Sequence, residues 1–123
     1  MIDSKTTVAE LRDVVEQFVA ERDWHQFHTP KNLAMALAIE AAELMEHFQW
    51  LTPDQSWQVA DQPQKKTEVG EELSDVFCYL LALANELDLD LSAALEDKMV
   101  KNAQKYPVKQ FRGLFGPDDP NGK

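Results

Sequence analysis

The sequence predicts an all-α fold, a four-helix bundle that assembles into an oligomer. Apolar residues recur at helical spacing along most of the 123 residues, and no strand-like alternation is sustained. Only 4 glycines occur, and three of them lie beyond residue 112. A chain of this length forms a single domain with a modest core of its own. We expect that domain to span residues 1–108, followed by a mobile tail at 109–123.

The first helix is predicted over residues 7–22. Its apolar residues form one stripe, and Thr6 or Thr7 can cap its start. Glu10 fits the third helical position of a capping box. An aromatic-rich connector at 24–28 then leads to the second helix.

The second helix is predicted over residues 31–49. Thr29 and Pro30 precede it as an N-cap and a first-turn proline, which is a typical start signal. The segment is apolar on nearly every side, and such a helix is normally buried all round. One small bundle barely surrounds a helix of this kind, so we expect a second subunit to cover it.

The third and fourth helices are predicted over residues 64–87 and 91–105. A linker at 50–63, punctuated by Thr-Pro and Gln-Pro, precedes them and has room for a short helical turn. The apolar positions of the third helix again form a stripe. Pro107 ends the fourth helix.

Charge and composition exclude several classes of protein. The formal net charge of −10 argues against a nucleic-acid partner, because such proteins neutralise phosphates with a basic surface. A nucleotide substrate stays possible, since a metal ion can bridge acids to phosphates. The single cysteine, Cys78, has no internal disulfide partner and is interpreted as a small buried hydrophobe. No signal peptide and no apolar run of ~18 residues is found, so we expect a cytoplasmic protein without a membrane partner.

Two pairs of acids lie on the apolar sides of the second and third helices. Glu40 and Glu43 form one i, i+3 pair, and Glu72 and Asp75 form the other. Neither pair has a basic residue within reach on its own helix. Most acid pairs at this spacing are solvated, but burying these without a partner costs several kcal/mol. The pattern therefore favours an external cation.

Four carboxylates projecting from two antiparallel helices form an all-oxygen site. Oxygen ligands suit Mg²⁺, or Mn²⁺, better than zinc or copper. The paired Glu-x-x-His motifs of di-iron bundles are absent. His47 is the one imidazole within helical reach of the acids, and we interpret it as a surface or interface residue.

The fourth helix carries Lys98, Asn102 and Lys105 on one face. Cations at a helix C-terminus interact favourably with its dipole, which explains them without a ligand. Beside a metal site, the same face is suited to polyphosphate oxygens.

Four aromatic residues near the acids are candidates for stacking on a nucleobase: Trp24, Phe27, Trp50 and Tyr79. Each taken alone is more often a packing residue. Other chemistries have no support, because the sequence has no phosphate-binding glycine loop, no GxSxG motif and no cysteine–histidine zinc spacing.

These blocks resemble the MazG-like all-α nucleotide pyrophosphohydrolases, and the match is closer to their dCTP pyrophosphatase branch. The resemblance rests on four segments in order, at 22–33, 40–50, 71–76 and 98–108. It implies Mg²⁺-dependent hydrolysis of a nucleoside triphosphate to a monophosphate and pyrophosphate, in a homodimer or homotetramer that cleanses the nucleotide pool.

The resemblance also implies roles for individual residues. The metal ligands would be Glu40, Glu43, Glu72 and Asp75, with Glu40 or Glu43 as the catalytic group that activates water. Substrate contacts would come from Trp24, His28, Trp50, Tyr79, Lys98, Asn102, Lys105 and Tyr106. Animal members of the dCTP branch carry a histidine where Val15 falls here, so dUTP or an oxidised nucleotide remains an alternative substrate. A non-enzymatic acidic helical module that binds a basic partner is the alternative from another class.

Overall fold

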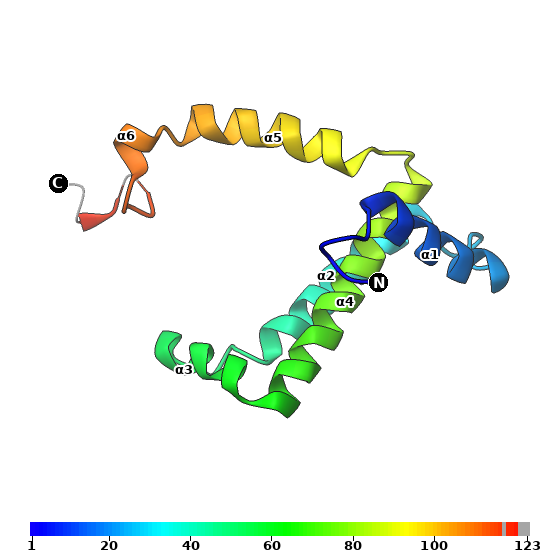
Figure 1. Ribbon diagram of the computed structural model, residues 1–123, viewed down its shortest axis with the longest axis horizontal. Helices are drawn as coiled ribbons and strands as arrows, with labels where there is room; N and C mark the ends of the chain where they lie inside the picture. The colour runs from blue at the N-terminus through cyan, green and yellow to red at the C-terminus, as the bar shows by residue number, and fades with distance from the viewer. Residues whose placement is uncertain (117, 121–123) are drawn as a thin grey trace. The chain divides into compact units, whose positions relative to one another are not determined.

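The computed structural model describes residues 1–116 and 118–120, and these residues form helices and no strands. The all-α class predicted from the sequence is therefore confirmed. The chain divides into two compact units, one ending at Leu89 and the other beginning at Asp90. Figure 1 shows the helices of both units. The first unit contains α1 Val8–Glu21, α2 Pro30–Glu46, α3 Pro53–Trp57, the 3₁₀ helix η1 Gln58–Asp61 and α4 Pro63–Glu86. The second unit contains α5 Leu91–Lys105 and α6 Val108–Phe111.

The helix starts follow the capping residues of the sequence. The Thr7 hydroxyl accepts a hydrogen bond from the Glu10 amide at 3.2 Å, and the Thr7 amide donates to Glu10 at 2.6 Å, which completes the predicted capping box. At the start of α2 the Thr29 hydroxyl accepts from the Asn32 amide at 3.2 Å. α2 ends at Glu46, three residues before its predicted end, because the chain turns through residues 47–50.

The core of the first unit lies where α2 and α1 contact α4. Figure 1 shows α2 alongside α4. Leu33 of α2 is only 1% exposed and Leu81 of α4 is 2% exposed. Val15 and Val19 of α1 are also buried. This small core aligns the two acid-bearing helices.

Arg12 of α1 binds the C-terminal end of α4. Its guanidinium donates hydrogen bonds to the Asn85 side chain at 2.8 Å and to the carbonyl oxygens of Ala84 at 3.2 Å and Leu89 at 2.5 Å. The Asn85 amide in turn donates to the Arg12 carbonyl at 3.1 Å. These hydrogen bonds fix α1 against the C-terminal end of α4.

Replacing Arg12 by Leu is expected to lower the free energy of unfolding by about 1–3 kcal/mol, since it removes charge-assisted hydrogen bonds, including the part-buried one to the Asn85 side chain. Urea unfolding followed by circular dichroism measures the change. Arg12→Lys keeps the charge but not the planar fork, so its loss is expected to be smaller. Equal urea midpoints for wild type and Arg12→Leu would contradict this role.

The other helices of the first unit leave much of α2 uncovered. Met35, Ile39 and Met45 are 55–58% exposed, although the apolar pattern predicts burial all round. The physical reason is that α4 contacts only one side of α2 in the first unit. Burial of the other side against a second subunit stays a prediction. Trp57 is also exposed, at 79%.

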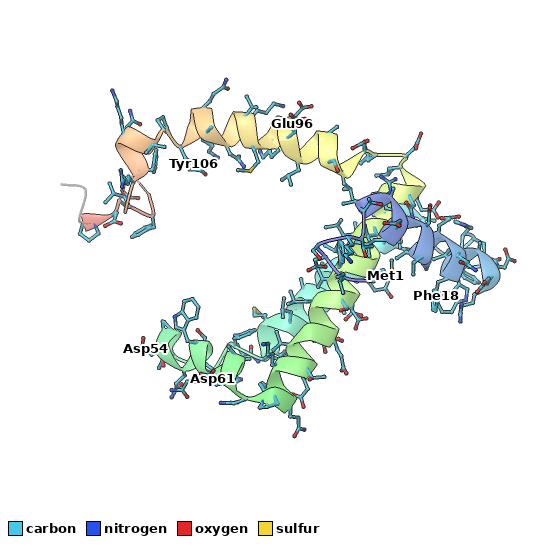
Figure 2. The ribbon with its side chains drawn as sticks, viewed as in Figure 1. Met1, Phe18, Asp54, Asp61, Glu96 and Tyr106 are labelled. Carbon is cyan, nitrogen blue, oxygen red and sulfur yellow. The ribbon has the colours of Figure 1, made fainter. Side chains whose placement is uncertain are left out.

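The second unit consists of α5, α6 and the residues that follow. Asp90 caps α5 by accepting from the Ala93 amide at 2.9 Å. Figure 2 marks Glu96 on α5 and Tyr106 at its end, and the Tyr106 ring meets the Phe111 ring edge to face at 5.2 Å. The helix α6 begins at Val108, where the mobile tail was predicted to follow. Part of that tail, 117 and 121–123, lies outside the described residues.

No helix among the described residues combines the length and the apolar character needed to span a membrane.

Candidate functional site

The two acid pairs face each other across the contact between α2 and α4. Glu43 of α2 lies against Glu72 of α4, and Glu40, one turn earlier on α2, interacts with Asp75, one turn later on α4. This register is that of antiparallel helices. Glu40, Glu43 and Glu72 each offer a carboxylate oxygen within 4.8 Å of the others. The i, i+3 spacing of the acids on each helix therefore places carboxylates from both helices in one cluster.

The cluster accumulates negative charge in a partly buried place. Burial, then the adjacent Glu43, then Asp75 and Glu72 raise the pKa of Glu40 from 4.5 to about 7. Burial is also the largest cause of the raised pKa of Glu72, followed by Glu43. The Oε2 atoms of Glu40 and Glu72 are buried with no hydrogen-bond partner among the described residues. Such groups are stable when a cation or a proton compensates them.

His47 approaches the cluster from the end of α2. Its Nε2 atom lies 3.9 Å from Glu72 Oε1, and its side chain is only 17% exposed. His47 is therefore half-buried beside the acids, and its interpretation as an interface residue stays a prediction. The signal was present in the sequence, because His47 follows Glu43 by four residues and shares its helix face.

A cavity of about 280 Å³ adjoins the acids. Glu40 and Asp75 form its acidic part, and the rest is mainly apolar and aromatic. Its other lining residues are Val15, Phe18, Val19, Trp24, His28, Cys78, Tyr79 and Ala82.

The aromatic residues of the cavity contact one another. Trp24 meets Phe18 edge to face, with ring centroids 5.7 Å apart, and lies 6.1 Å from the His28 ring. Figure 2 marks Phe18 on α1. The Nδ1 atom of His28 is buried without a partner among the described residues. Burial, then the charge of Glu40, raises the pKa of the Tyr79 hydroxyl, which keeps Tyr79 protonated and able to donate a hydrogen bond. A flat ring with polar edges fits such a space.

The structure thus brings together seven of the predicted site residues: Trp24, His28, Glu40, Glu43, Glu72, Asp75 and Tyr79. Trp50 instead lines a second cavity of about 400 Å³ with His47 and is 87% exposed. The remaining four, Lys98, Asn102, Lys105 and Tyr106, belong to the second unit, and their part in the site stays a prediction.

Sequence reasoning missed most of the apolar lining. Phe18 and Val19 fit the apolar stripe of the first helix, and the sequence predicts a buried Cys78, which is half-buried and lines the cavity. Helical periodicity marks an apolar face but does not distinguish a wall of a cavity from a packed contact. Val15 is the one lining residue that the sequence comparison singled out, because animal members of the dCTP branch carry a histidine at this position.

Comparison with known proteins agrees with this architecture. A model of the MazG-like family matches residues 35–114. The rat protein dCTP pyrophosphatase 1 is 46% identical over 107 residues, which cover 87% of this chain and 63% of the rat protein. The human protein of the same name is 44% identical over 106 residues, covering 86% and 62%. The chain therefore spans less than two thirds of the curated relatives that it matches.

A solved structure gives the same result for the fold. The crystal structure of a pyrophosphatase from Archaeoglobus fulgidus superposes with a TM-score of 0.76 at 40% sequence identity, covering 87% of this chain and 99% of that one. The family model matches well over half of the chain. The resemblance drawn from the acid and aromatic segments is confirmed, and the chain belongs to the MazG-like family.

Proposed function

We propose that this protein is a Mg²⁺-dependent nucleoside triphosphate pyrophosphohydrolase that acts on dCTP or a modified dCTP. The observation that carries the proposal is the acid cluster beside an aromatic cavity, which Glu40 of the cluster and the neighbouring Asp75 both line. A nucleotide matches both parts of this site, because its polyphosphate suits a metal held by the acids and its flat base suits the aromatic cavity. The names of the relatives, dCTP pyrophosphatase 1 and a pyrophosphatase, support this substrate class. The cellular role would be removal of unwanted nucleotides in the cytoplasm.

The carboxylates fit a hard divalent ion. Glu40, Glu43 and Glu72 converge within 4.8 Å, and Asp75 adds charge beside them. All four offer oxygen, which suits Mg²⁺, with Mn²⁺ as the alternative. When bound, the ion would neutralise charge on the phosphates and on the leaving pyrophosphate.

The reaction needs one water and no covalent intermediate. Glu40 or Glu43 would hold the water through a carboxylate oxygen and accept its proton. The water oxygen would bond to the α-phosphorus as the bond from that phosphorus to the bridging oxygen of pyrophosphate breaks. The products would be a nucleoside monophosphate and pyrophosphate, as expected for a displacement at the α-phosphorus.

The base would lie in the cavity between the aromatic walls. Trp24 and Tyr79 supply stacking surfaces, worth about 1–3 kcal/mol per base. The Nδ1 atom of His28, which has no hydrogen-bond partner within the described part of the chain, would bind the base or sugar. Trp50 and the face formed by Lys98, Asn102, Lys105 and Tyr106 would complete the substrate contacts in a homodimer or homotetramer. The exposed apolar residues of α2 support such an assembly.

Hydrolysis of an equimolar panel of nucleoside triphosphates tests the proposal. With Mg²⁺, we expect dCTP or a 5-modified dCTP to give the highest kcat/KM, with monophosphate and pyrophosphate as products in equal amounts. Preferred cleavage of dUTP or an oxidised nucleotide would keep the chemistry and change the substrate. The apolar Val15 wall, which offers the base no hydrogen bond, is the observation that favours this second candidate. Failure to cleave any nucleotide with Mg²⁺ or Mn²⁺ would leave the acidic interaction module.

A further inference from the structure

The connector between α1 and α2 is held by a histidine that lies between two carboxylates. His25 Nδ1 is 2.5 Å from Glu86 Oε1 on α4, and His25 Nε2 is 2.8 Å from Glu16 Oε1 on α1. A carboxylate accepts hydrogen bonds only, so both ring nitrogens must carry a proton to satisfy this arrangement. The two hydrogen bonds, that with Glu86 first, accordingly raise the pKa of His25 above 6.5.

The same connector carries two walls of the nucleotide cavity. Trp24 directly precedes His25 and His28 follows it by one turn, and both line the cavity. The backbone reverses at Asp23, whose φ is +52°, and the Trp24 amide then donates to Val19 at 3.1 Å. These backbone bonds tie the connector to α1. The hydrogen bond between His25 and Glu86 ties the connector to α4.

We propose that His25, in its protonated form, is a positioning residue that sets nucleotide affinity by holding Trp24 and His28 against the cavity. This inference rests on the proposed function. Glu16 faces the imidazole from α1 and Glu86 faces it from α4. On the connector itself, Asp23 accepts a hydrogen bond from Gln26, and Arg22 lies 3.7 Å above the Phe18 ring.

Loss of the proton breaks this arrangement in a defined way. A neutral imidazole donates from one nitrogen only, so the other presents a lone pair to a carboxylate. One of the two contacts becomes repulsive, and the connector loosens. KM for the nucleotide then rises, while kcat is unchanged because His25 does not touch the acid cluster.

Three proteins test the inference at saturating Mg²⁺ across about pH 6 to 9. For the wild type, KM is expected to rise about fivefold to tenfold with pH, which corresponds to losing one charge-assisted hydrogen bond. His25→Ala is expected to show the high KM at every pH. Glu16→Gln is expected to keep the low KM at high pH, because its amide can donate to the neutral ring. Asp13→Asn, an exposed carboxylate of α1, serves as the matched control with wild-type behaviour.

A merely structural role predicts something else. His25→Ala would then lower kcat and the urea midpoint together, with a ratio of variant to wild-type KM that does not change with pH, and this result would overturn the inference. So would a Glu16→Gln variant that follows the wild-type pH profile.

A readout without substrate separates this inference from the proposed function. The Trp24 indole N–H resonance, assigned by its absence in Trp24→Phe, is expected to shift with the titration of His25 and to stop doing so in His25→Ala. If the wild type cleaves no nucleotide, the proposed function fails, and this titration still decides whether His25 positions Trp24. An indole resonance that does not follow His25 overturns the positioning role.

Discussion

Glu72→Gln is expected to reduce Mg²⁺-dependent release of pyrophosphate about a thousandfold. The amide keeps the shape of the side chain but removes one of the three converging charges. A bound ion contributes several kcal/mol of charge stabilisation in the transition state, and each 1.36 kcal/mol is a factor of ten in rate. Steady-state kinetics with dCTP, together with Mg²⁺ titration by calorimetry, measures both effects.

The neighbouring Glu71 is a matched control for this substitution. Glu71 is exposed and is not part of the converging group. Glu71→Gln is expected to retain wild-type kinetics. Without metal, Glu72→Gln is expected to unfold at an equal or higher urea concentration than the wild type, because it relieves repulsion from Glu43 and Asp75. Wild-type activity in Glu72→Gln would remove this residue from the metal site.

Mg²⁺ is expected to displace about one proton from the metal-free protein at pH 6, and almost none at pH 8. The reason is that Glu40, with a pKa of about 7, is protonated below that pH and must ionise to bind a cation. Apparent Mg²⁺ affinity should therefore increase about tenfold per pH unit up to about pH 7 and then level off. Calorimetry in buffers of different ionisation enthalpy counts the protons released.

The same titration makes stability depend on pH in a direction opposite to that of most acids. Between pH 4.5 and about 7, folded Glu40 holds a proton that the unfolded chain has lost. The contribution of Glu40 to the free energy of unfolding therefore falls as pH rises through this window in the metal-free protein. Glu40→Gln is expected to abolish both this dependence and the release of a proton. Proton release that is unchanged in Glu40→Gln would show that another group of the cluster carries the proton.

Most of the helical architecture is predictable from local signals. The capping box at Thr7 and the Thr29-Pro30 start are interactions between residues close in the chain, so their patterns are visible in the sequence. Helix ends are less certain, as the early end of α2 at Glu46 shows. No capping motif marks that end, and competing turns differ little in energy.

The sequence by itself determined the acids, their helical spacing and the hard character of the cation they suit. Spacing of i, i+3 along each helix places Glu40 with Glu43 and Glu72 with Asp75 on common faces, whatever the helices contact. Only the tertiary structure decided which acids meet across the helices, because that depends on the antiparallel register of α2 and α4. It also decided that His25 joins α1 to α4 and that Trp24 lies near Phe18. Contacts between segments far apart in the chain depend on packing, which no local pattern encodes.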